Sequence, residues 1–202
     1  GYALLLSAAA SSGLGMVYWL LAAHFYPVAT VGLNAAAIAA LMLLSGLSQF
    51  SLNSALVRFL PEAGGRTPRF IGFTYLVSLA IAAALGLLFS RGLAWWAPAL
   101  RSFLEPPIAV LLFTLSIMVW SIFALQDSVL TGLRQTAWVP VENVLVAVGK
   151  IVLLWLFATP FPVYGLFAAW IIPAAVSLLP VNLLLFWRLI PQHAQNSAGR
   201  YR

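Results

Sequence analysis

Six long apolar stretches, separated by short polar breaks, dominate the chain. About 20 consecutive apolar residues cross the hydrocarbon core of a bilayer, and each stretch reaches that length. The breaks are rich in proline, glycine and charged residues, which favour loops over helix. The pattern therefore predicts an all-α membrane protein with six transmembrane helices, at about residues 2–25, 34–59, 70–89, 107–130, 138–158 and 163–189.

The composition supports the bilayer as the solvent for most of this chain. Of its 202 residues, 63% are hydrophobic and only 7% are charged, whereas about 25% of the residues of an average soluble domain are charged. The mean hydropathy is +1.03. A net charge of +6 would suggest nucleic acid as a partner of a soluble protein. In a membrane protein the arginines report topology instead, and we expect no nucleic-acid partner.

Arginines gather on alternate breaks and so predict the orientation. Only Arg91 and Arg101 lie on one side, in the loop of about residues 90–106, where Trp95 and Trp96 favour a short interfacial helix. The other side carries Arg58, Arg66, Arg69, Arg134, Arg188, Arg200 and Arg202. Because positive residues stay inside, we expect both ends of the chain on the cytoplasmic face of the inner membrane. Residues 1–190 form one lobe, and residues 191–202 form a cytoplasmic tail or linker.

Lys150, the only lysine, lies in the middle of the fifth apolar stretch. A lysine at the centre of a membrane helix costs about 2.5–3.5 kcal/mol on insertion scales. Lys150 lies roughly 18 Å along the helix from Trp138, too deep for its stem to reach either surface. Three explanations stay open: backbone carbonyls that cap the ammonium, a partner outside this sequence, or a cavity where the ammonium meets an anionic substrate. We favour the cavity.

Polar side chains at helical spacing extend the predicted cavity. Asn143 precedes Lys150 by seven residues and lies within about 20° of it around the helix. Ser45, Gln49 and Asn53 are four residues apart and share one face of the second predicted helix. We expect all five to line a substrate cavity. For Gln49 and Asn53, hydrogen bonds between helices are an equally open alternative.

The remaining charges of the membrane segments lie nearer the cytoplasmic side. Asp127 and Glu142 each lie about one turn inside a predicted helix, at the level of Arg58 and Arg134. We predict that these four form an ion-pair cluster, with a role in an inner gate as the alternative. Glu142 is about 80° from Lys150 around the helix, which we interpret as a similar side.

Enzyme chemistry has no support in the sequence. It contains neither a phosphate-binding glycine loop nor an HExxH motif, and neither His24 nor His193 is beside a carboxylate. There is no cysteine, which leaves no thiolate metal site. We therefore predict no enzyme activity, no catalytic residues, no metal and no cofactor.

Several segments resemble a known transporter family. Residues 13–23 (GLGMVYWLLAA), 31–33 (VGL) and 54–61 (SALVRFLP) resemble the opening of polysaccharide-transporter flippases. These belong to the multidrug/oligosaccharidyl-lipid/polysaccharide exporter superfamily. Residues 127–134 (DSVLTGLR), followed by Glu142, Asn143 and Lys150, resemble the fourth and fifth helices of that family. The similarity follows the whole chain in order through loose motifs.

The resemblance implies one half of a two-lobed, MATE-like transporter of twelve or more helices. The chain, which begins with Gly1, would be the N-terminal half of a longer protein, with a second six-helix half of the same protein as its partner. The implied substrate is a lipid-linked oligosaccharide, often on a polyprenyl pyrophosphate, that serves O-antigen or other polysaccharide synthesis and crosses by alternating access. Two alternatives remain: an ion-coupled multidrug exporter that uses Asp127 or Glu142, and a non-transporting scaffold subunit. The first helix has no acid, which favours the polysaccharide branch.

Overall fold

The chain folds as a bundle of helices in which the described residues contain no strand. The computed structural model describes residues 2–192, with side chains from Ser12 onward; the predicted tail, Arg200 and Arg202 included, falls almost wholly outside. The long helices are α1 (Tyr2–Phe25), α2 (Val28–Gln49), α4 (Thr67–Arg91), α6 (Pro107–Gly132), α7 (Trp138–Phe157) and α8 (Gly165–Leu184). Shorter elements are α3 (Leu52–Phe59), α5 (Leu93–Trp96), η1 (Leu60–Glu62), η2 (Gly64–Arg66), η3 (Pro98–Leu100) and η4 (Leu185–Leu189).

Five helical segments are long and apolar enough to cross a membrane. They are Val28–Gln49, Gly64–Arg91, Pro107–Gly132, Trp138–Phe157 and Gly165–Gln192. In α1, the residues with described side chains form an apolar helical segment at Ser12–Phe25. The prediction of an all-helical chain is therefore confirmed, and five of the six predicted spans have the length and apolar composition of membrane-crossing helices.

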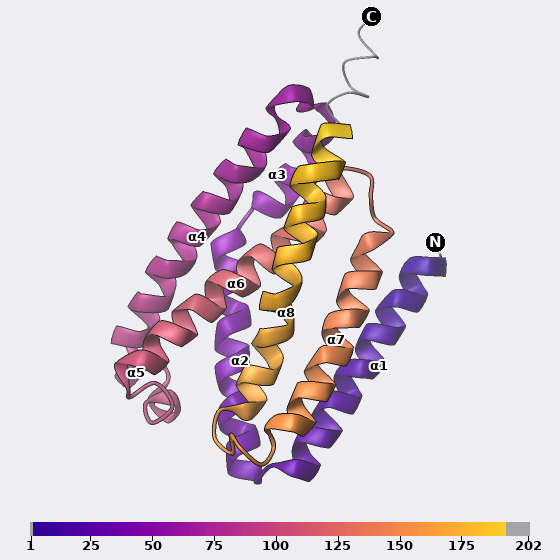
Figure 1. Ribbon diagram of the computed structural model, residues 1–202. Helices are drawn as coiled ribbons and strands as arrows, with labels where there is room; N and C mark the ends of the chain where they lie inside the picture. The colour runs from indigo at the N-terminus through magenta and orange to yellow at the C-terminus, as the bar shows by residue number, and fades with distance from the viewer. Residues whose placement is uncertain (1, 193–202) are drawn as a thin grey trace, which may run out of the picture.

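Helix α6 is the centre of the bundle. It packs against α4, α2, α3 and α8, whereas α7 packs mainly against α8 and α1. Figure 1 shows α7 between α1 and α8, with the α1–α2 and α7–α8 turns at one end of the bundle. The α3–α4 link and the α6–α7 loop lie at the opposite end. Because α7 packs against α1 and α8 more than against α6, a small cavity remains between α6 and α7.

The second predicted helix differs most from the structure. It begins at Val28 rather than at residue 34, directly after Pro27, because proline's fixed φ suits the start of a helix. It then breaks at Phe50, whose φ of 37° is left-handed, and resumes as α3. No glycine or proline marks this break in the sequence, so the pattern predicted one continuous helix over 34–59.

The other boundaries lie close to the prediction. Helix α4 begins at Thr67, three residues early, and the loop of residues 90–106 contains the short helix α5. Trp95 of α5 is 90% exposed, while Trp96 donates a hydrogen bond to the Phe89 carbonyl at 3.0 Å. Helix α8 contains Pro173 and Pro180 and continues into the π-helical turn η4.

Small and polar residues hold the helices together inside the bundle. The Ser48 and Ser121 hydroxyls are 2.7 Å apart between α2 and α6, and Ser78 of α4 lies 3.5 Å from Ser48. Asn34 of α2 donates to the Val163 carbonyl and accepts from the backbone N–H of Phe167. Such contacts commonly stabilise the association of membrane helices, because in lipid the hydrophobic effect does not favour the association of two apolar helices.

Candidate functional site

Two indole rings surround the ammonium of Lys150. Its Nζ lies 3.7 Å from the ring centroid of Trp170 on α8 and 4.7 Å from that of Trp120 on α6. A cation over an aromatic face gains about 0.5–1 kcal/mol when exposed and about 2 kcal/mol or more when desolvated. In the described part of the chain these rings are its contacts, and neither a carboxylate nor a backbone carbonyl accepts a hydrogen bond from it. Capping by carbonyls is thus not what the structure shows.

Lys150 lines a cavity of about 170 Å³ between α1, α6, α7 and α8. Asn143 lines the same cavity, as the seven-residue spacing predicted. Trp170 lines it too, and its indole N–H is buried without an acceptor. The remaining lining residues are mostly apolar or aromatic: Leu14, Gly15, Tyr18, Trp120, Phe123, Val146 and Ala147. Cationic and neutral N–H donors therefore outnumber acceptors in this cavity.

The other three predicted cavity residues lie elsewhere. Asn53 donates to Gln49 Oε1 at 2.8 Å and accepts from the Ser128 hydroxyl of α6 at 3.2 Å. Ser45 donates to the Met42 carbonyl of its own helix. None of the three lines the Lys150 cavity. For Gln49 and Asn53 the structure shows the alternative, hydrogen bonds between helices, here from α3 to α2 and from α6 to α3.

Asp127 and Glu142 find neutral partners rather than arginines. Asp127 Oδ2 accepts from Asn143 at 3.2 Å, and Glu142 Oε1 accepts from Ser177 of α8 at 3.1 Å. The second oxygen of each carboxylate is buried without a hydrogen-bond partner. Neither acid is hydrogen-bonded to an arginine among the described residues, so these bonds do not form the predicted ion-pair cluster.

The two arginines of that predicted cluster have other surroundings. Arg58 is exposed and its guanidinium lies over the Phe59 ring, 5.3 Å from the centroid. Arg134 is also exposed, with a φ of 61°. Its backbone N–H and that of Gln135 bond to the Thr131 and Leu130 carbonyls, the pattern of a Schellman motif that closes a helix. Arg134 thus ends α6, and a role of either arginine in a gate stays a prediction.

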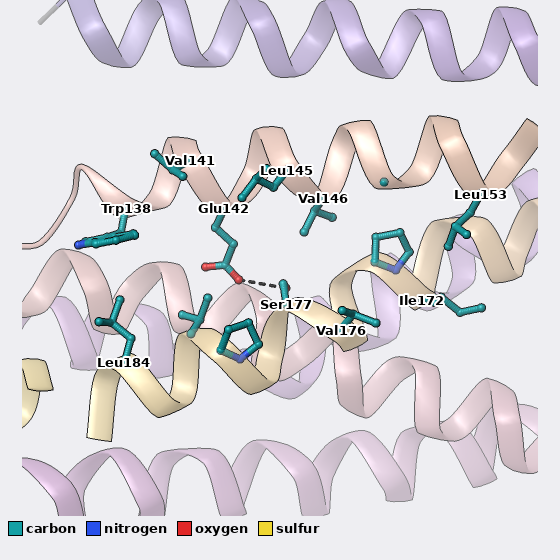
Figure 2. Close-up of a pocket in the computed structure, with 14 residues that line it drawn as sticks. Trp138, Val141, Glu142, Leu145, Val146, Leu153, Ile172, Val176, Ser177 and Leu184 are labelled. Carbon is teal, nitrogen blue, oxygen red and sulfur yellow. Dashed lines mark hydrogen bonds between the residues drawn. The ribbon is translucent and has the colours of Figure 1, made fainter. Parts of the chain in front are cut away.

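Glu142 lies in a different hollow from Lys150. This groove of about 560 Å³ runs between α7 and α8, and Figure 2 shows Glu142 directed from α7 toward Ser177. Its other lining residues are apolar: Trp138, Val141, Leu145, Val146, Gly149, Leu153, Ile172, Pro173, Val176, Pro180, Val181 and Leu184. Successive helical residues differ by about 100° around the axis, so Glu142 faces α8 while Asn143 faces α6. The expectation that Glu142 shares a side with Lys150 is wrong.

Four residues that the sequence pattern did not single out contact predicted site residues: Trp120, Trp170, Ser128 and Ser177. Trp120 carried a usable signal, because it lies near the middle of a long apolar stretch, whereas membrane tryptophans concentrate at the two interfaces. The serines carried none, because small hydroxyl residues are common wherever membrane helices pack.

Comparisons with known proteins add no relative. No protein-family model matches the chain, and no curated protein and no solved structure matches it either. Within residues 2–192, no three histidine, cysteine, aspartate or glutamate side chains come together as they would around a metal ion.

Proposed function

We propose that this chain is one six-helix, MATE-like lobe of a flippase that exports anionic lipid-linked glycans from the cytoplasmic membrane. The observation that carries the proposal is the Lys150 ammonium, held in a cavity inside a multi-pass helical bundle by aromatic faces alone. A charge at membrane depth usually marks a substrate or ion pathway. Its natural ligand is an anion, which the described part of this cavity does not itself provide.

The cavity suits a phosphate group better than a sugar chain. Its volume of about 170 Å³ equals the liquid volume of roughly six water molecules. The Lys150 ammonium and the Trp170 indole N–H are available there as donors, whereas the Asn143 amide already donates to Asp127 and to the Val139 carbonyl. The glycan would occupy the larger space between this lobe and a second lobe of the same protein.

The indole faces allow exchange. Hydrogen bonds between charged groups are roughly twice as strong as neutral ones, so a phosphate competes well with a ring for the ammonium. The rings would hold Lys150 until the headgroup arrives and take it back after release. Because the indole rings are neutral and bind the Lys150 ammonium weakly, the ammonium stays available to the substrate. A carboxylate in their place would compete with the substrate for it.

The test is export of lipid-linked glycan by cells that carry the intact protein with Lys150→Ala. A hydrogen bond to a charged group is worth about 1.5–3 kcal/mol, so we expect export to fall about 10- to 100-fold at equal protein level. Lys150→Arg keeps the charge and should retain part of the activity. Arg101→Ala, in the loop that directly follows η3, is the matched control for loss of a positive charge. Undiminished export by Lys150→Ala would refute the proposal.

A second candidate is an ion-coupled drug exporter of the same fold. It is favoured by the two acids, each with one buried oxygen that lacks a partner, because an uncompensated buried carboxylate takes up a proton or cation. Glu142 also lies in the large apolar groove, which suits lipophilic compounds. Here efflux of such compounds would depend on Glu142 and Asp127, tested as Glu142→Gln and Asp127→Asn, and would survive Lys150→Ala. The flippase predicts the opposite dependence on Lys150.

A further inference from the structure

An open hollow of about 470 Å³ lies at the corner where α3 leads into α4. Its lining combines charged and aromatic residues, namely Phe59, Glu62, Ala63, Arg66, Arg69, Phe70 and Phe73. Figure 1 places this corner at the same end of the bundle as the α6–α7 loop, far from α5. The hollow therefore lies at the rim of the membrane-crossing segments, apart from both the Lys150 cavity and the α7–α8 groove.

The charge around the hollow is mainly positive. Arg66 and Arg69 are both exposed and both line it, together with one acid, Glu62. Arg58 adds a third guanidinium beside the wall, over the ring of Phe59. Three arginines against one glutamate leave the corner with an excess of cationic donors.

The wall of the hollow also holds exposed aromatic rings. Phe59, at the end of α3, is 52% exposed and Phe73 is 66% exposed. Phe73 follows Phe70 by three residues, roughly 4.5 Å further along α4 toward the middle of its apolar span. Along α4 the lining thus changes from the guanidinium groups of Arg66 and Arg69 to the rings of Phe70 and Phe73 at greater depth. That order of polarity matches a phospholipid, with its headgroup at the rim and its chains below.

We propose that this corner binds an anionic phospholipid, with the phosphate on Arg66 and Arg69 and an acyl chain along Phe59 and Phe73. Guanidinium groups form paired hydrogen bonds to phosphate oxygens, and basic pockets beside membrane helices bind anionic headgroups. A zwitterionic lipid carries no net charge, because its own ammonium offsets its phosphate, so these arginines give it no net attraction. The site does not depend on the proposed transport function and exists equally in a scaffold subunit.

Lipid binding to the purified, delipidated intact protein tests the site, with native mass spectrometry to count bound phosphatidylglycerol or phosphatidylcholine. We expect Arg66→Gln/Arg69→Gln to weaken phosphatidylglycerol binding about tenfold, the equivalent of about 1.4 kcal/mol, and to leave phosphatidylcholine unchanged. Glu62→Gln should tighten phosphatidylglycerol binding, because it removes the one negative charge of the hollow. Phe73→Ala should weaken both lipids through the chain.

The matched control is Arg91→Gln/Arg101→Gln, which removes the same charge at the opposite end of the bundle. Phosphatidylglycerol binding that falls equally in both double variants would mean diffuse attraction to basic residues and would overturn the site. Unchanged binding in Arg66→Gln/Arg69→Gln would overturn it too. Displacement of phosphatidylglycerol by inorganic phosphate at a similar concentration would assign the arginines to a free anion instead. Glu62→Gln also controls for a folding defect, because we expect it to tighten phosphatidylglycerol binding, whereas a misfolded variant would lose binding.

Discussion

Lys150 illustrates how two neutral rings substitute for a counter-ion. Its placement in a membrane helix costs about 2.5–3.5 kcal/mol, and a ring returns between about 0.5 kcal/mol when exposed and about 2 kcal/mol or more when desolvated. The Trp170 centroid lies 3.7 Å from Nζ and the Trp120 centroid 4.7 Å, so the nearer ring contributes more. With one ring at close range, we expect the lysine to remain a net cost to folding, as is common for residues kept for function.

Lys150→Met should accordingly stabilise the protein. Methionine removes the desolvated charge and packs well against aromatic rings, so we expect a gain of about 1 kcal/mol in the free energy of unfolding. Chemical or thermal unfolding of the purified protein measures it. Leu145→Met, on the exposed face of the same helix, is the control and should change little. A loss of stability in Lys150→Met would mean that the ammonium has a favourable partner beyond the two rings.

At the scale of elements, the contact between α4 and α6 depends on one glycine. A Cβ at Gly86 would lie 2.9 Å from the Thr114 methyl and 3.2 Å from Ile117 Cδ1. At Gly72 of the same helix, a Cβ would meet nothing within 4 Å. Close helix approach through small residues is a main source of packing energy in membranes, so these two glycines differ in role although their sequence surroundings are alike.

Gly86→Leu should therefore force α4 away from α6. Overpacking of a tight contact costs about 1–3 kcal/mol, and we expect a loss of that size in the free energy of unfolding. Gly72→Leu adds the same side chain at an exposed position and should be neutral. Equal stability of the two variants in a thermal unfolding series would show that α4 and α6 are not packed at Gly86 as described.

Helix ends could be predicted from the sequence only where proline or glycine interrupts the apolar pattern. Pro27 and the run of proline and glycine after Phe59 broke the apolar pattern where the structure also has its turns. The break at Phe50 carried no such signal, because a bulky residue seldom adopts a φ of 37° by its own preference. One predicted helix thus became α2 and α3.

Across the whole molecule, the described arginines divide between the two ends of the bundle. Arg91 and Arg101 lie near α5 at one end, and the opposite end holds Arg58, Arg66, Arg69, Arg134 and Arg188. The fold thus keeps the asymmetry on which the predicted orientation rests. By the positive-inside rule, we expect the richer end to face the cytoplasm.

Single cysteines test this orientation, since the sequence contains none. Thr136→Cys lies in the α6–α7 loop and Ala99→Cys lies in η3; both positions are exposed. In intact cells a membrane-impermeant thiol reagent should label the cysteine at 99 and spare the one at 136. Permeabilised cells should label both, which serves as the control. The reverse pattern in intact cells would invert the predicted topology.

The sequence by itself determined the helices, their approximate limits and the shared side of Asn143 and Lys150 on α7. Apolar length, proline and glycine act locally, and a seven-residue spacing fixes two side chains on one side of any helix. Only the tertiary structure decided what each side faces. It directed Glu142 to Ser177, joined Asn53 to Ser128 and placed Trp120 and Trp170 around Lys150. Helical periodicity sets angles within one helix, whereas the choice of neighbour depends on the shapes of several helices packed together.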